Sequence, residues 1–251
     1  AALLAVIRGR PITGQDMEKL IGHMLYTMLL NRVTLSLLQH VYTYVRSAYL
    51  TRQPVWASVR RELSTIRGIL PLCRVAFGLP LNPGIYATDA CPSGYAVCRA
   101  SFDRELLGPI AASHERWRFK NSDLSGAGPR ITGLQNRDSL EDVLTARPMV
   151  LGEVPPTLVI DSNFPEIPSE ILQPEDWILL WNSKLENSES IHVLEARGLF
   201  ACVRHYVRSL QHHGTEVIVL GDNMSVVLAG CKGRCADPYL LALFRRLGAL
   251  C

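Results

Sequence analysis

A proline- and glycine-rich break at residues 79–84, LPLNPG, separates two parts of the sequence with different hydrophobic patterns. Before it, apolar residues recur at steps of three and four within residues 14–50 and again within residues 55–72, which is the spacing of one helix face. After it, short apolar runs alternate with turn residues, which favours strands. We therefore expect a helical segment over residues 1–82 and a mixed α/β domain over residues 83–251.

The second part is expected to contain several short strands and two long helices. The predicted strands are residues 84–90, 95–102, 157–163 (or an apolar loop segment), 176–184 and 215–222. The predicted helices are residues 192–213 and 236–250, the second with Asp237 as its N-cap and Pro238 at its first position. Residues 121–150 are rich in Ser, Gly, Asp and Arg and are expected to form an exposed insertion. This order predicts a mixed sheet with flanking helices.

Composition argues against several classes of protein. Apolar residues make up 48% of the chain, which is enough for a hydrophobic core and too many for a disordered protein. The net charge of +3 does not by itself indicate a nucleic-acid partner. The seven cysteines form no CxxC pair, so we expect free thiols in an intracellular, reducing compartment. The opening run AALLAVIRGR is too short to span a membrane, and both ends are expected to be cuts in a longer protein.

Three acidic residues stand at the ends of predicted elements. Asp89 ends the strand-like run YATDA, Asp222 follows the run VIVLG, and Glu195 lies in the first turn of the long helix between them. Because ligands gather beyond the carboxyl ends of strands in open α/β sheets, we expect these carboxylates to converge. Close carboxylates repel one another unless a cation lies between them, and such oxygen ligands suit Mg²⁺ or Mn²⁺. Taken singly, each acid is more often a helix cap, a turn residue or a residue of a helix first turn than a functional group, and the signal lies in their order along the chain.

The sequence around these acids resembles a known family. The segments ATDACPSGYAVC, HERWRFK, FPEIPSEIL, SIHVLEARGLF and LGDNMSVVLAGCKGR are similar, in this order, to the RNase H-like region of retroelement polyproteins of the DIRS/Ngaro-like branch. The preceding ITGQDMEKLIGHMLYTMLLNR and PVWASVRRELSTIRGILPL resemble the reverse-transcriptase thumb and connection of the same polyproteins. The resemblance covers nearly the whole chain. It implies an RNase H-like fold preceded by a helical thumb/connection segment.

The resemblance also implies a metal-dependent nuclease. In that family a first-strand Asp, a first-helix Glu and an Asp after the fourth strand hold the metals, which matches Asp89, Glu195 and Asp222. The implied reaction is hydrolysis of the RNA strand of an RNA–DNA hybrid with Mg²⁺ (or Mn²⁺), and the implied partners are nucleic acid and the rest of the polyprotein. A fourth acid of the family has no counterpart, since Asp237 follows Asp222 too closely and is better explained as a cap. We therefore expect a C-terminally truncated domain that acts as an RNA–DNA hybrid ribonuclease if the missing C-terminal segment is supplied. We expect no polymerase activity, because the palm aspartates are absent.

Residues next to the acids have two interpretations each. Ser93 and Gly94 form the turn after the first strand, which can approach the RNA backbone in this family or can be a plain hairpin turn. Asn223 is a candidate contact for a phosphate or a 2′-hydroxyl, although a helix cap is favoured. These three residues are predicted to bind nucleic acid if the domain acts on a hybrid.

Basic residues give a second set of candidates. Lys232 and Arg234 lie in the loop GCKGRC, which we expect near the third acid and predict to bind phosphate. Arg197, Arg204 and Arg208 flank the long helix, and for them a solvated helix face is favoured over phosphate contacts.

Two classes of function therefore remain open. The first is a catalytic RNase H-like nuclease. The second is a degenerate, non-catalytic nucleic-acid-binding module of a truncated retroelement copy, with a helical segment that acts only as a scaffold as a further possibility. Uptake of divalent ions by the three acids separates a catalytic site from a scaffold.

Overall fold

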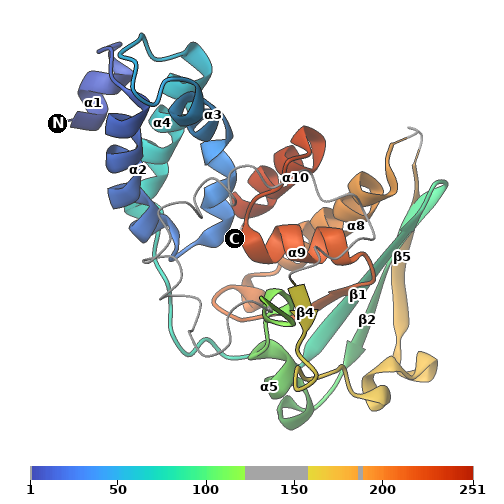
Figure 1. Ribbon diagram of the computed structural model, residues 1–251. Coiled ribbons are helices and arrows are strands. Elements are labelled where there is room, and N and C mark those ends of the chain that lie inside the picture. Colours follow the sequence, from blue (N-terminus) through green and yellow to red (C-terminus); the bar gives the residue numbers. More distant parts are fainter. Residues whose placement is uncertain (1, 122–157, 186–188, 251) are drawn as a thin grey trace.

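The computed structural model describes residues 2–121, 158–185 and 189–250 (Figure 1). The N-terminal helical segment contains α1 (Ala2–Ile7), α2 (Gly14–Met28), the 3-10 helix η1 (Arg32–Leu38), α3 (Gln39–Ser47), α4 (Ala57–Ile69) and the 3-10 helix η2 (Leu70–Leu72). Its core is a continuous apolar cluster drawn from all of these helices. The fully buried members include Met17, Ile21, Leu38, Val41, Val59, Leu63 and Ile66.

The helix expected across residues 14–50 is interrupted after Met28. Thr13 caps its start, because the Thr13 hydroxyl accepts a hydrogen bond from the Asp16 backbone N–H at 3.0 Å. At the other end, the Thr34 hydroxyl lies 3.2 Å from the Met28 carbonyl and 2.6 Å from the Asn31 carbonyl, to which it donates. A side-chain hydroxyl that donates hydrogen bonds to these carbonyls competes with the backbone hydrogen bonds of a continuing helix. The chain therefore turns there and continues as η1.

The second part of the chain is built on a four-stranded mixed sheet. Its strands are β1 (Gly84–Cys91), β2 (Gly94–Ser101), β5 (Ile178–Lys184) and β6 (Val219–Gly221), in the order β5-β2-β1-β6. Strand β1 pairs antiparallel with β2 and parallel with β6, and β2 pairs antiparallel with β5. The helices are α5 (Arg104–Ala111), α8 (Ile191–Tyr206), α9 (Met224–Lys232) and α10 (Pro238–Gly248). The predicted mixed α/β class is confirmed.

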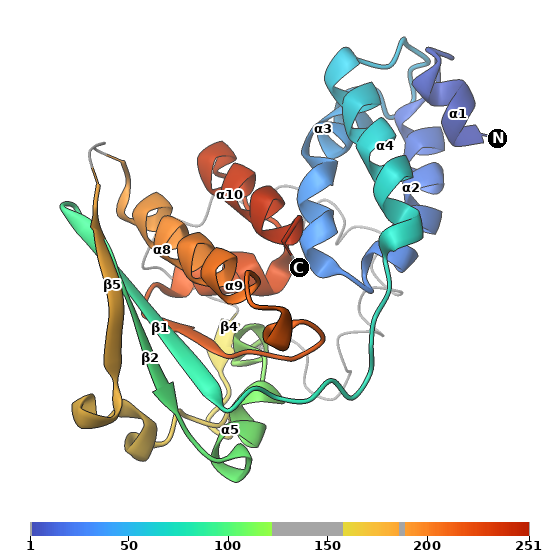
Figure 2. The same ribbon diagram turned by 180° about the vertical axis from the view of Figure 1, so that it is seen from behind.

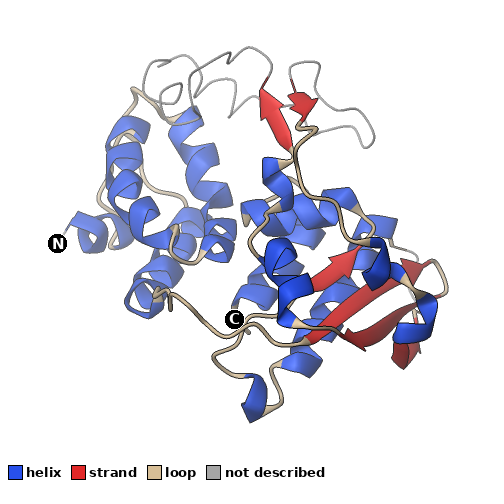
Figure 3. Ribbon diagram, turned by 90° about the horizontal axis from the view of Figure 1, so that it is seen from below, coloured by secondary structure: helices blue, strands red, loops and turns tan. Residues whose placement is uncertain are grey.

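Two of the predicted strands differ from expectation. The strand expected at residues 157–163 is β4 (Leu158–Ile160), which pairs with β3 (Phe119–Asn121) in a separate two-stranded sheet. Figure 3 shows these two short arrows apart from the main sheet. The strand expected at residues 215–222 is reduced to three residues of β6. The predicted insertion at residues 121–150 lies outside the described residues except for Asn121.

Helices cover the two faces of the sheet unequally. On one face α8 packs against β1 and β2, and α10 packs on α8 (Figure 2). On the other face Ile85 and Ala100 contact Leu107 of α5 and Ile171 of the 3-10 helix η4 (Ser169–Leu172). Because this second cover reaches only the beginning of β1, the strand is buried at its start and exposed at alternate residues toward its end.

One contact between the helical segment and the α/β part is a buried carboxylate. Glu62 of α4 is 6% exposed, and its Oε2 accepts hydrogen bonds from the backbone N–H groups of His40 and Val41 at 2.9 and 3.0 Å. Its Oε1 accepts one from Arg245 of α10 at 3.0 Å, and Arg245 also donates to the Ser36 carbonyl. One carboxylate thus satisfies the first turn of α3 and fixes α10 against the helical segment.

Replacing Glu62 by Ala should lower the free energy of unfolding by about 3 kcal/mol. The change leaves two backbone N–H groups and the Arg245 guanidinium without their acceptor in a buried place. Urea unfolding measures the effect, with Glu175→Gln as the control because Glu175 is an exposed carboxylate. Equal unfolding midpoints for the two variants would contradict this account of the junction.

Candidate metal centre

The parallel pairing of β1 with β6 brings two of the predicted acids together. In this pairing Thr88 lies opposite Gly221, so Asp89 and Asp222 each follow the paired position on neighbouring parallel strands. Both side chains are exposed, because the cover on this part of the sheet ends before Asp89. A carboxylate at the end of an apolar strand is therefore placed at an open edge and not in the core.

Helix α8 supplies the third acid through a close approach to the sheet. A Cβ placed on Gly198 would lie 3.6 Å from the Cβ of Tyr95 and 3.7 Å from that of Thr88, so this helix surface rests directly on β1 and β2. Glu195 lies one helical turn before Gly198 and is only 5% exposed. The tight packing of α8 thus carries Glu195 to the end of β1.

The three carboxylates form one cluster. One oxygen of each of Asp89, Glu195 and Asp222 lies within 4.8 Å of the others. Within the described part of the chain, this is the one group of three or more acidic, His or Cys side chains close enough to share a metal ion. The convergence predicted from the sequence is present, and the cluster could hold a metal ion.

The electrostatics of the cluster favour a cation. Burial first, and then the charges of Asp222 and Asp89, raise the pKa of Glu195 from 4.5 to about 7, although a hydrogen bond from the Ala90 backbone N–H opposes the shift. The repulsion by Asp222 and Asp89, which adds to the effect of burial, is the interaction that a bound cation reverses. The donor set therefore fits a hard, oxygen-seeking divalent ion.

A polar side-chain contact links the two elements that carry Glu195 and Asp222. Asn223 caps α9, since its side-chain oxygen accepts a hydrogen bond from the Val226 N–H at 3.3 Å, as the favoured interpretation predicted. Its side-chain nitrogen lies 3.0 Å from Nδ1 of His192 in the first turn of α8. Sequence reasoning assigned His192 no role. The available signal was its position three residues before Glu195, on the same helix face.

The turn between β1 and β2 has a structural reason for its glycine. A Cβ on Gly94 would lie 2.5 Å from the Ser183 carbonyl oxygen, so only glycine lets β2 pair with β5 at this point. Ser93 is exposed, and its hydroxyl lies 3.1 Å from the Cys91 sulfur. Contact of Ser93 and Gly94 with nucleic acid stays a prediction.

The loop that contains Lys232 and Arg234 lies at the far end of α9 from Asp222. Eight helical steps separate Met224 from Lys232, which corresponds to about 12 Å. Gly233 adopts the left-handed conformation at φ 68°, and a Cβ there would lie 1.9 Å from the Arg32 carbonyl oxygen of η1. The expected position beside the third acid is therefore wrong, and the loop packs against the helical segment instead. Phosphate binding by Lys232 and Arg234 stays a prediction.

Asp237 is a helix cap, as the sequence predicted. Its Oδ1 accepts hydrogen bonds from the Tyr239 and Leu240 backbone N–H groups at 2.8 and 2.9 Å, at the start of α10. Asp237 is not part of the carboxylate cluster. The carboxylate of Asp237 is thus occupied by the backbone and supplies no fourth ligand.

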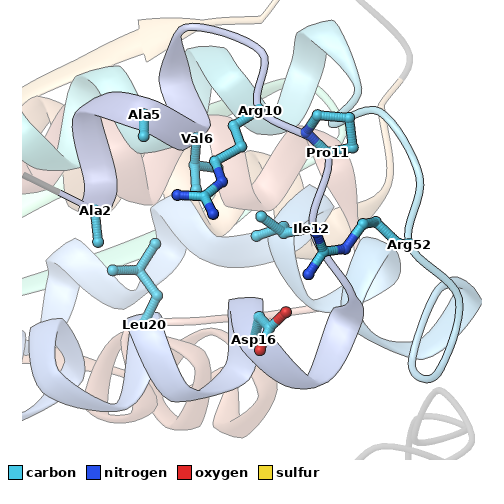
Figure 4. A pocket seen from close by; sticks show the side chains of 9 residues that line it. All are labelled: Ala2, Ala5, Val6, Arg10, Pro11, Ile12, Asp16, Leu20 and Arg52. Carbon is cyan, nitrogen blue, oxygen red and sulfur yellow. The ribbon is translucent and has the colours of Figure 1, made fainter.

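A separate hollow of about 300 Å³ lies in the helical segment, between α1 and the start of α2. Figure 4 shows Arg10, Arg52 and Asp16 around it, together with apolar side chains such as Leu20. The nearby charges are two guanidiniums and one carboxylate. A hydrogen bond from Thr13 holds the pKa of Asp16 below its usual value, so this carboxylate stays ionised and leaves one net positive charge.

No family model, curated protein or solved structure matches this chain. Among the residues that the structure describes, no helix combines the length and the apolar character needed to cross a membrane.

In the absence of metal, Glu195 should make the protein less stable at high pH. Its pKa of about 7 in the folded state exceeds 4.5, the ordinary value, so unfolding releases a proton between these limits. The contribution of Glu195 to the free energy of unfolding is therefore most favourable below pH 4.5, and it is lost as the pH rises through 7. Replacing Glu195 by Gln should remove this loss. Without metal, the gain in the free energy of unfolding on this substitution should be about 2 kcal/mol larger at pH 8 than at pH 5.

Urea unfolding in a chelator at several pH values measures this difference, with Glu175→Gln as the control. Added Mg²⁺ should abolish the pH dependence of the unmodified protein and leave that of the Glu195→Gln variant unchanged. The same pH dependence in both proteins without metal would show that neither burial nor the neighbouring charges raise the pKa of Glu195.

Proposed function

We propose that this chain is an RNase H-like nuclease domain that hydrolyses the RNA strand of RNA–DNA hybrids with Mg²⁺ (or Mn²⁺). The observation that carries the proposal is the approach of Asp89, Glu195 and Asp222 to within 4.8 Å of one another. These residues were selected from the sequence by their places at the ends of predicted elements. Their convergence is the arrangement that metal-assisted phosphodiester hydrolysis requires.

The order of elements around the cluster supports the proposal. Along the chain, β1, β2, β5 and β6 are the first to fourth strands of the main sheet. Asp89 lies on the first, Asp222 directly follows the fourth, and Glu195 lies on α8 between the third and the fourth. This is the placement implied by the resemblance to retroelement RNase H regions. One departure is α5, a short helix that precedes α8, so Glu195 lies on the second helix of this part.

The three residues have different tasks in the proposed reaction. When bound, the divalent ions would supply charge neutralisation at the phosphate and activation of water. Asp89 and Asp222 would present carboxylate oxygens to the ions and to the approaching phosphate from the exposed edge of the sheet. Glu195 would present its carboxylate oxygen to the ions from the buried side. The packing of α8 on β1 and β2 would fix the position of this carboxylate. The contact between His192 and Asn223 would keep the carboxylates of Glu195 and Asp222 at a constant separation.

The choice of an RNA–DNA hybrid rests on the resemblance. Contacts to 2′-hydroxyl groups distinguish RNA from DNA, and a wide, shallow minor groove presents them in a hybrid duplex. Ser93, exposed in the turn after β1, and Asn223, next to Asp222, are the candidates for such contacts. The other partners implied are the remaining parts of a retroelement polyprotein.

The Asp222→Asn variant should lose cleavage of an RNA–DNA hybrid by about a hundredfold or more, because one of three charged ligands is removed. Binding of the uncleaved hybrid should change little, since the variant removes a negative charge from the path of the phosphates. A hybrid labelled on its RNA strand, incubated with Mg²⁺, measures both. The matched control is Asp237→Asn, which should retain activity because asparagine caps helices as well as aspartate does.

Other outcomes separate the alternatives. If neither protein cleaves the hybrid and both bind it, the chain is a non-catalytic nucleic-acid-binding module. If the Asp222→Asn variant cleaves as fast as the unmodified protein, Asp222 is only a residue of the turn before α9 and the metal-centre assignment is wrong.

A further inference from the structure

A second hollow of about 570 Å³ lies between α8, the end of β5 and α10. In Figure 2, α8 runs between the upper part of β5 and α10. We call this hollow the basic groove, because its lining includes six basic side chains and no acidic one. The basic residues are Lys184, Arg197, Arg204, His205, Arg208 and Arg246.

The charges in the basic groove are only partly neutralised. Arg197 forms an ion pair with Glu189, whose Oε1 lies 2.6 Å from the Arg197 Nη2. Lys184, Arg204 and Arg208 are exposed and have no carboxylate partner among the described residues. Arg246 lines the hollow too and has no carboxylate partner among the described residues, so four unpaired positive charges face the same hollow.

Helix electrostatics explain part of this arrangement only. Cations near the C-terminus of a helix are favoured by its dipole, which accounts for Arg204 and Arg208 at the end of α8. Lys184 belongs to β5 and Arg246 to α10, and neither lies near that helix end in sequence. Their convergence on the same hollow concentrates like charge, which costs free energy unless an anion offsets it.

Aromatic rings line the same hollow. The guanidinium of Arg246 lies over the Phe200 ring, 4.8 Å from its centroid, which holds that charge in place. The Trp181 and His205 rings are 4.7 Å apart. Guanidiniums pair well with phosphate, and aromatic rings contact sugars and bases, so this combination fits nucleic acid better than an acidic peptide.

We propose that the basic groove binds the phosphodiester backbone of the RNA–DNA hybrid, away from the metal centre. The inference rests on the proposed function for the identity of the ligand. Helix α8 carries Glu195 near its start and Arg204 nine residues later, a separation of about 14 Å along the helix axis. Nine residues are about two and a half helical turns, so Arg204 lies on the opposite side of α8 from the buried Glu195. The groove would therefore hold the hybrid at a place separate from the metal centre. Arg204 and Arg208 are exposed, as the favoured solvated helix face predicts, and the proposal adds a binding role to that exposed face.

Hybrid binding by the double variant Arg204→Ala/Arg208→Ala tests the proposal. Fluorescence anisotropy with a labelled RNA–DNA hybrid, in a chelator and at several KCl concentrations, measures affinity without cleavage. The double variant should bind about tenfold more weakly, and the slope of log affinity against log salt should fall by about two. The control Arg61→Ala/Arg67→Ala removes the same charge from the exposed surface of α4 and should change the affinity less than about twofold.

Thermal unfolding confirms that the variants remain folded, as expected for exposed side chains. Equal loss of affinity in both double variants would show a general charge effect and overturn the groove. Unchanged affinity in the Arg204→Ala/Arg208→Ala variant would also overturn it. If polyglutamate of equal charge competes as well as unlabelled hybrid, the groove is selective for negative charge alone and the nucleic-acid assignment is wrong.

The test is independent of catalysis. Loss of binding in the Arg204→Ala/Arg208→Ala variant, together with no cleavage by the unmodified protein, would retain the groove and reject the nuclease. Cleavage that depends on Asp222, with unchanged binding by the double variant, would retain the nuclease and reject the groove.

Discussion

The mutual repulsion of three carboxylates at the end of β1 is the constraint on which the account of this molecule depends. Asp89 and Asp222 are fixed side by side by the parallel pairing of β1 and β6, and Glu195 is brought to them by the packing of α8. Folding places a carboxylate with 5% exposure beside two others, which raises the pKa of Glu195 to about 7. A fold that holds such an unfavourable arrangement must offset it elsewhere, and a bound cation is the simplest way to relieve it.

The support of the cluster extends into the helical segment. Helices α8, α9 and α10 share an apolar cluster, so the position of α8 depends on α10. Helix α10 is in turn held by the contact of Arg245 with Glu62 and by Gly248, whose backbone touches Val33 of η1. The helical segment therefore contributes to the placement of Glu195 although it supplies no ligand. This coupling gives the helical segment a structural role beside any contact with nucleic acid.

The parts of the structure that the sequence predicts are those set by local pattern. Asp89 and Asp222 were identifiable because each follows an apolar run, and Asp237 because a proline follows it. The interruption after Met28 was missed because the Thr34 hydroxyl acts on carbonyls several residues away. The pairing of residues 158–160 with residues 119–121 and the place of Lys232 against Arg32 depend on contacts between distant segments. The basic groove was missed for the same reason, since Lys184, Arg204 and Arg246 belong to three separate elements.

A crystal of the protein soaked in Mn²⁺ would test the central claim most directly, because anomalous scattering locates the ion without reference to activity. The account predicts at least one manganese peak between Asp89, Glu195 and Asp222, with carboxylate oxygens at ordinary coordination distances, and its loss in the Asp222→Asn variant. The absence of a manganese peak among these three residues in a crystal soaked in saturating Mn²⁺ would contradict the assignment of a metal centre. The same peak in a crystal of the Asp222→Asn variant would contradict it too.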